Sequence, residues 1–124
     1  MTTFYSKLDH ITRKNKSFLC VGLDPELKSI PDSFSKLKNP FFEFNRAIID
    51  ATADLVCAFK PQIAYYSALG LEADLKMTFE YLQKNHPEIL TILDSKRGDI
   101  DSTATQYARE SFERYQADTV TINA

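Results

Sequence analysis

Apolar residues recur every three or four positions in several segments of the chain, which is the spacing that places them on one face of an α-helix. The first segment carries Phe4, Leu8 and Ile11, with Thr2 or Thr3 available as its N-cap. The same pattern predicts three further helices: one from Asn39-Pro40 to about Asp54, one that ends at Asn85-His86-Pro87, and one over residues 104–115. A short helical turn is expected at Tyr65 and Tyr66, closed by Gly70.

Short apolar runs that stop at proline or aspartate separate these helices and predict strands. The first is a buried strand that starts near residue 17 and ends at Asp24, and a polar loop over residues 29–39 follows it. The other predicted strands are Leu55–Lys60, Ile89–Asp94 and Thr119–Asn123. Strands that are apolar on both faces and alternate with helices indicate an α/β fold with a parallel sheet. Such a pattern fits either half of a (β/α)8 TIM barrel or the start of an open doubly wound sheet.

The residues at the strand ends favour the barrel. The glycine-rich nucleotide fingerprints G-x-G-x-x-G and G-x-x-x-x-G-K-[ST], which are typical of open sheets, do not occur. Ionisable residues stand instead at the carboxyl ends of three successive predicted strands: Asp24, Lys60, and Asp94 with Lys96. In a barrel enzyme, the active site is built at these ends.

The amino-acid composition and charge exclude several classes of protein. The 124 residues include 15 Lys and Arg against 17 Asp and Glu, a net charge of −2, which excludes a basic nucleic-acid-binding module. The longest apolar runs, such as residues 18–21 and 55–59, are far shorter than the ~20 residues of a membrane-spanning helix, so we expect no membrane partner. The first ten residues resemble neither a signal peptide nor a transit peptide, and a cytoplasmic location is expected.

Cysteine and histidine give no sign of a metal site or a thiol site. Cys20 and Cys57 each lie within an apolar run and have no ligand-spaced partner, so we expect both to be buried core residues. His10 and His86 are expected on a helix face and at a helix end.

The chemistry of the chain is concentrated in residues 93–103. Asp94 and Lys96 should point to the same side, because side chains along a strand alternate with a period of two. Asp99 and Thr103 are four residues apart at the expected start of a helix and would share one face, which could be presented to a neighbouring subunit.

A lysine held among carboxylates keeps its charge in a pocket, because the neighbouring anions oppose the effect of desolvation. Its ammonium group can stabilise a developing carbanion and deliver a proton to it. Asp24 and Lys60 extend this alternation of charge. Taken singly, Asp24 is typical of a turn, and Lys60 is typical of a side chain that reaches solvent from a strand end. Their occurrence at equivalent strand ends favours a functional site.

Three motifs carry a resemblance to a known family. Residues 94–103 (DSKRGDIDST), 21–25 (VGLDP) and 59–62 (FKPQ) resemble orotidine 5'-phosphate decarboxylase, in the right order and at matching strand ends. The context FKPQIAYY at 59–66 and the long loop after residue 25 are similar to its second bacterial subgroup. The resemblance extends over the whole chain. It implies a (β/α)8 barrel that removes the carboxylate of orotidine 5'-phosphate to give uridine 5'-phosphate in pyrimidine biosynthesis, with no metal or organic cofactor.

The resemblance also implies roles for individual residues. Lys96 would protonate C6 of the pyrimidine as carbon dioxide leaves, and Asp94 would lie against the substrate carboxylate. Lys60 would hold the charge network and a ribose hydroxyl, and Asp24 would bind the ribose side of the ligand.

A homodimer is implied as well. Asp99 would be supplied by the partner subunit to complete the charge network, and Ile100 and Thr103 would line the shared site.

The chain length suggests that part of this barrel lies elsewhere. A complete barrel needs about 250 residues, so residues 1–124 are expected to form the N-terminal half of a single barrel domain. The remainder, with the phosphate-binding loops after strands seven and eight, would belong to another chain or a further segment.

Two alternatives stay open. One is a magnesium-dependent sugar-phosphate decarboxylase or aldolase of the same superfamily, which shares the D-x-K-x-x-D core. The other is a non-catalytic half-barrel that only assembles with another polypeptide. The strand end at residues 59–61 favours the orotidylate enzyme.

Overall fold

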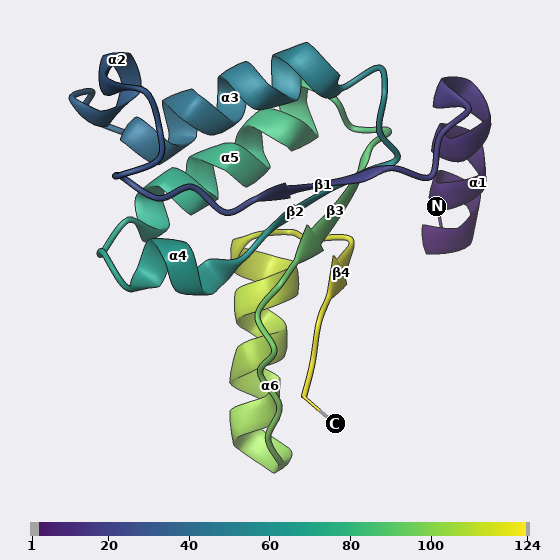
Figure 1. Cartoon of the computed structure of the whole chain (residues 1–124). Coiled ribbons are helices and arrows are strands. Elements are labelled where there is room, and N and C mark those ends of the chain that lie inside the picture. Colours follow the sequence, from purple (N-terminus) through teal and green to yellow (C-terminus); the bar gives the residue numbers. More distant parts are fainter. Residues whose placement is uncertain (1–2, 124) are drawn as a thin grey trace.

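A computed structural model describes residues 3–123 as a four-stranded parallel sheet with helices between the strands (Figure 1). The strands are β1 (Cys20–Leu23), β2 (Ala58–Pro61), β3 (Leu90–Leu93) and β4 (Thr119–Val120). Each strand pairs with the next one along the chain, in the order β1-β2-β3-β4. An order that never reverses is the arrangement of a (β/α)8 barrel, whereas a doubly wound sheet changes direction at its switch point.

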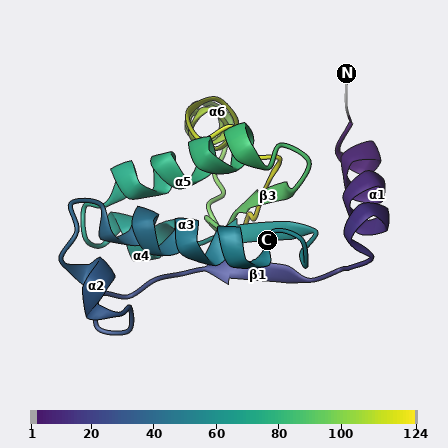
Figure 2. The ribbon, with the colours of Figure 1, turned by 90° about the horizontal axis from the view of Figure 1, so that it is seen from above.

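Helices cover one face of the sheet and the amino ends of its strands. Helices α3 and α5 lie side by side over the sheet, and α1 stands beside the amino ends of the strands (Figures 1 and 2). The helices are α1 (Phe4–Asn15), α2 (Asp32–Ser35), α3 (Pro40–Thr52), α4 (Ile63–Ser67), α5 (Glu72–Asn85) and α6 (Asp101–Arg109), which continues as the π-helix η1 (Glu110–Arg114). α4 starts two residues after β2 ends, at the carboxyl end of that strand (Figure 1).

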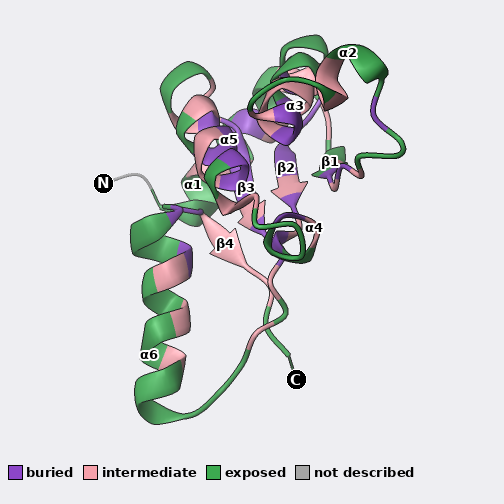
Figure 3. Cartoon of the chain, turned by 90° about the vertical axis from the view of Figure 1, so that its left-hand side faces the viewer, coloured by how far each residue is buried: buried purple, intermediate pink, exposed green. Residues whose placement is uncertain are grey.

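The hydrophobic core lies between the sheet and α3 and α5, as the buried residues in Figure 3 show. One cluster joins Ile11 of α1 to Phe59 of β2 and Leu82 of α5. A second cluster, near α4, contains Phe41 and Tyr66. Aromatic rings fill much of this second cluster, and Phe41 meets Tyr66 edge to face at a centroid distance of 5.6 Å.

The predicted order of helices and strands is confirmed, but the predicted burial of the first strand is wrong. Phe18 is 88% exposed, and Cys20 is exposed, whereas Cys57 is buried as expected. Within residues 3–123, β1 pairs with β2 only and therefore forms an edge of the sheet. An apolar run in the sequence predicts that its residues are buried, but it does not show which element covers them.

Several boundaries also differ from the prediction. The expected loop over residues 29–39 contains the short helix α2. β2 starts at Ala58 instead of Leu55, and Leu55 is exposed in the preceding turn. The helix predicted over residues 104–115 starts earlier, at Asp101, and widens into η1 from Glu110. β4 covers two residues, Thr119 and Val120, of the five expected.

The start of α3 depends on a side chain from α5. Asn39 and Pro40 occupy the N-cap and first-turn positions as predicted, but the Asn39 side chain does not cap its own helix. The buried carboxylate of Asp74 does so instead, accepting hydrogen bonds from the backbone N–H groups of Phe41 (2.9 Å) and Phe42 (3.1 Å). Asn39 Nδ2 donates to the other Asp74 oxygen at 3.0 Å. This contact fixes α3 against α5 and so sets the layer above the sheet.

Replacing Asp74 with alanine should lower the free energy of unfolding by about 3 kcal/mol, because buried N–H donors lose a charged acceptor. Urea denaturation of the protein expressed from its gene measures the change. Glu80→Ala is the matched control: Glu80 is on the same helix and makes only a surface ion pair with Lys76, so its loss should cost no more than about 0.5 kcal/mol. Equal losses in the two variants would contradict the capping role of Asp74.

Candidate active site

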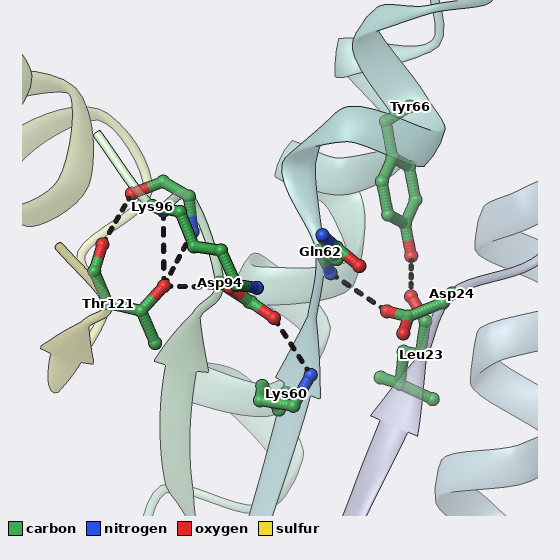
Figure 4. Close-up of polar contacts among 9 residues, drawn as sticks. Leu23, Asp24, Lys60, Gln62, Tyr66, Asp94, Lys96 and Thr121 are labelled. Carbon is green, nitrogen blue, oxygen red and sulfur yellow. Dashed lines mark hydrogen bonds and ion pairs between the residues drawn. The ribbon is translucent and has the colours of Figure 1, made fainter. Parts of the chain in front are cut away.

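Polar side chains follow the last residue of each strand. These residues are Asp24 after β1, Gln62 after β2, Asp94 after β3 and Thr121 after β4. Because the strands are parallel and in register, all four lie along one edge of the sheet (Figure 4). Of the ionisable residues predicted at the strand ends, Lys60, Asp94 and Lys96 are in direct contact.

Asp94 is the centre of this edge, and its carboxylate is almost completely buried. One oxygen, Oδ1, accepts from Lys96 Nζ at 2.6 Å and from Thr121 Oγ1 at 2.7 Å. The other, Oδ2, accepts from Lys60 Nζ at 3.1 Å. Asp94 and Lys96 therefore point to the same side, as expected, but Lys96 lies beyond β3 and reaches Asp94 through a left-handed backbone turn (φ 48°) rather than through the strand period. A single carboxylate is held between two ammonium groups that come from two different strand ends.

The electrostatics of these contacts favour the charged forms of Asp94 and Lys60. Burial by itself raises the pKa of the Asp94 carboxyl, but hydrogen bonds from Lys96, Thr121 and Lys60 outweigh it and lower the pKa from 3.8 to about 2. Burial likewise favours a lower pKa for the Lys60 ammonium, but the hydrogen bond to Asp94 and the charges of Asp24 and Asp94 raise it above its usual value.

Asp24 joins the site through its charge and through the backbone of β2. Its Oδ1 accepts from the Gln62 backbone N–H at 3.0 Å, which ties the ends of β1 and β2 together. The carbonyl of Leu23, the preceding residue, accepts from the buried Tyr66 hydroxyl at 2.6 Å (Figure 4). The hydroxyl of Tyr66 in turn accepts from Asn45 Nδ2 at 2.8 Å. The position of Asp24 is thus fixed from the helical layer as well as from the sheet.

Asp99, Ile100 and Thr103 lie outside this cluster. All three are exposed, Ile100 by 77%, and within residues 3–123 no hydrogen bond or ion pair links them to Asp94 or its lysines. The prediction that Asp99 shares a helical face with Thr103 is wrong, because α6 starts only at Asp101. The Asp99 carboxylate accepts from the backbone N–H of Ile100 at 2.8 Å, which turns the chain before the helix.

Thr121, Gln62 and Tyr66 are site residues that sequence reasoning did not assign a role. Thr121 meets Asp94 because Val120 pairs with Leu93, and this register between strands has no local sequence signal. Gln62 acts through its backbone N–H, which carries no sequence signal. Tyr66 was expected only in a short helical turn, and its hydrogen bond to the Leu23 carbonyl of β1 depends on tertiary structure.

The side chains of this cluster can stabilise negative charge. A carboxylate flanked by fixed ammonium groups is an electrostatically ordered site in which a new anion can be stabilised and a proton delivered. The Lys96 side chain is 57% exposed, so its ammonium group can reach a ligand placed above the sheet edge.

Neither a metal cluster nor a membrane span is present in the described part of the chain. Among residues 3–123, no three His, Cys, Asp or Glu side chains converge as metal ligands. No helix in this range is both long and apolar enough to cross a membrane.

The lowered pKa of Asp94 predicts how stability depends on pH. The ionised carboxylate stabilises the folded protein above its ordinary pKa of 3.8, and this contribution is lost as pH falls through about 2. Between about pH 5 and about pH 2, the wild type should lose about 2 kcal/mol of unfolding free energy that Asp94→Asn does not lose. Denaturant titrations across this range measure it. Asp54→Asn, at an exposed aspartate, should follow the wild type, and an Asp94→Asn profile equal to the wild type would contradict the assignment.

Comparison with known proteins identifies the family. The sequence profile of the orotidine 5'-phosphate decarboxylase / HUMPS family matches residues 17–124. The chain is 54% identical over 123 residues to orotidine 5'-phosphate decarboxylase from Cellvibrio japonicus, covering 98% of this chain and 45% of that protein. The same enzyme from Dechloromonas aromatica is 52% identical over 121 residues, with the same coverage. The chain thus spans about 45% of the length of these relatives.

A solved structure agrees with this result. A crystal structure from Toxoplasma gondii, assigned to orotidine-monophosphate-decarboxylase, matches 99% of this chain and 41% of its own chain, with a TM-score of 0.88 and 33% identity. This match confirms the (β/α)8 barrel class, of which the four parallel strands form a part. The profile match and the close relatives, together with the charged cluster at the strand ends, show that this chain belongs to the orotidine 5'-phosphate decarboxylase / HUMPS family.

Proposed function

We propose that the protein containing this chain decarboxylates orotidine 5'-phosphate to uridine 5'-phosphate, and that residues 1–124 are the N-terminal half of its single barrel domain. The observation that carries the proposal is the Asp94 carboxylate held between Lys60 and Lys96 at the sheet edge. The names of the relatives at 54% and 52% identity support this reaction. No metal or organic cofactor takes part in the proposed mechanism.

Lys96 is the proposed proton donor. When the bond between C6 and the carboxylate breaks, carbon dioxide leaves and the bonding electron pair stays on C6. An N–H bond of the Lys96 ammonium then breaks, and its proton forms the new C6–H bond. The short contact to Asp94 supports this role, because it holds the Lys96 ammonium in place.

The other residues of the cluster have proposed roles in binding and charge stabilisation. Asp94 would lie against the substrate carboxylate, where its negative charge becomes less unfavourable as carbon dioxide departs. Lys60 would keep the cluster ordered and contact a ribose hydroxyl, and Asp24 would bind the ribose side of the ligand. The backbone contacts of Asp24 with β2 support a rigid position for such a group.

We also propose that the active protein is a homodimer in which Asp99 completes the charged cluster of the partner subunit. Ile100 and Thr103 would line the same shared site. The exposure of all three residues, and their separation from the Asp94 cluster of their own chain, support a role toward a second copy.

Replacing Lys96 with alanine should reduce kcat for orotidine 5'-phosphate by at least about 10²-fold, because the proton donor is removed. The fold should be kept, since Lys96 is exposed and contributes no core contact. Release of uridine 5'-phosphate is followed spectrophotometrically in the protein expressed from its gene, and circular dichroism checks the fold. Lys84→Ala, at an exposed lysine on α5, is the control and should keep wild-type activity. Near-normal turnover in Lys96→Ala would overturn the proposed role.

Removal of divalent cations separates this proposal from a magnesium-dependent sugar-phosphate enzyme of the same superfamily. Activity on orotidine 5'-phosphate should be unchanged after treatment with EDTA and gel filtration, because the proposed proton donor and anion-stabilising groups are lysines. Turnover is measured before treatment, after treatment and after addition of magnesium. A loss of activity that magnesium restores would favour the metal-dependent alternative.

A further inference from the structure

Thr121 lies at the carboxyl end of β4, directly opposite Asp94 at the end of β3. Val120 pairs with Leu93 in the parallel register of β3 and β4, so the next residue of each strand faces the other. The backbone N–H of Thr121 donates to the Leu93 carbonyl at 3.1 Å, and this bond continues the ladder beyond β4. The Thr121 side chain is thus placed by the sheet itself rather than by a loop.

Every hydrogen-bonding position of the Thr121 hydroxyl is used. It faces Asp94 Oδ1 at 2.7 Å and the backbone nitrogens of Ser95 and Lys96, each at 3.1 Å (Figure 4). A carboxylate only accepts and a backbone N–H only donates, so the hydroxyl must donate to Asp94 and accept from the other two. One donor and two acceptor positions are the whole capacity of a hydroxyl group.

The same hydroxyl supports an unusual backbone conformation. Lys96 has a φ of 48°, in the left-handed region, which is unfavourable for a residue that carries a Cβ atom. The two N–H groups that meet at Thr121 Oγ1 belong to Lys96 and the residue before it. Ser95 Oγ adds a bond to the Thr121 carbonyl at 3.1 Å. This turn brings the Lys96 side chain back toward Asp94, where Nζ reaches Oδ1 at 2.6 Å.

We infer that Thr121 is a positioning residue, whose hydroxyl holds the Asp94 carboxylate and the backbone of Lys96 in one fixed relative geometry. The inference rests on the proposed function and names a residue on which its rate depends. Without the hydroxyl, Asp94 Oδ1 keeps only the contact to Lys96, and two backbone N–H groups lose their acceptor. The proton donor and its anionic partner then keep their ion pair but lose the hydroxyl that fixes both of them to the end of β4 before the substrate arrives.

Thr121→Val tests this inference, because valine keeps the size and the β-branched shape of threonine and removes only the hydroxyl chemistry. A misplaced reacting group costs about 10²-fold in rate, so kcat should fall by about that factor, with a much smaller change in KM. Thr121→Ser keeps the hydroxyl and should recover most of the wild-type kcat. Thr119→Val is the matched control: Thr119 lies on the same side of β4, and its hydroxyl has only a 3.5 Å contact to the Thr91 carbonyl.

The variants are assayed in the protein expressed from its gene, with melting temperatures measured in parallel. The inference predicts low kcat in Thr121→Val alone. It is overturned if Thr121→Val keeps wild-type kcat, if Thr121→Ser loses as much as Thr121→Val, or if Thr119→Val loses as much. Should valine prevent folding, Thr121→Ser still decides, because a folded serine variant must stay active. A wild-type protein that does not act on orotidine 5'-phosphate overturns the proposed function itself, which separates that failure from a failure of Thr121.

Discussion

The burial of one carboxylate among cations is the constraint on which the site depends. Asp94 is removed from water at the end of β3, and an ionised carboxylate in such a place is costly unless it is paired and hydrogen-bonded. Two ammonium groups and one hydroxyl provide this compensation, and they come from three different strand ends. The alignment of β2, β3 and β4 and the ionisation of Asp94 therefore stabilise each other.

The helical layer contributes to the same geometry from behind the sheet. Asp74 fixes the start of α3 against α5, and the neighbouring core places Tyr66 so that its hydroxyl reaches the carbonyl before Asp24. Polar contacts inside this layer are thus connected to the sheet edge by short, buried hydrogen bonds. This connection explains how a sheet of short strands can hold a charged cluster in one arrangement.

The segment between β3 and α6 has two different surroundings. Its first residues, Ser95 and Lys96, are bound to Thr121 and follow the sheet, whereas Asp99 and Ile100 are exposed at the start of α6. Such a division suits the proposed function, because it leaves one part of the segment in its own active site and makes the other available to a second subunit. The same short stretch of chain would then serve both sites of the dimer.

The local sequence pattern was sufficient to predict much of this structure. The period of apolar residues predicted the order of helices and strands, and the residues at the predicted strand ends included Lys60, Asp94 and Lys96, which the structure brings into contact. Tertiary structure alone decided where α6 begins relative to Asp99, which lies before the helix. It also decided that Thr121 meets Asp94, since contacts between segments 27 residues apart depend on strand pairing, which is a long-range interaction.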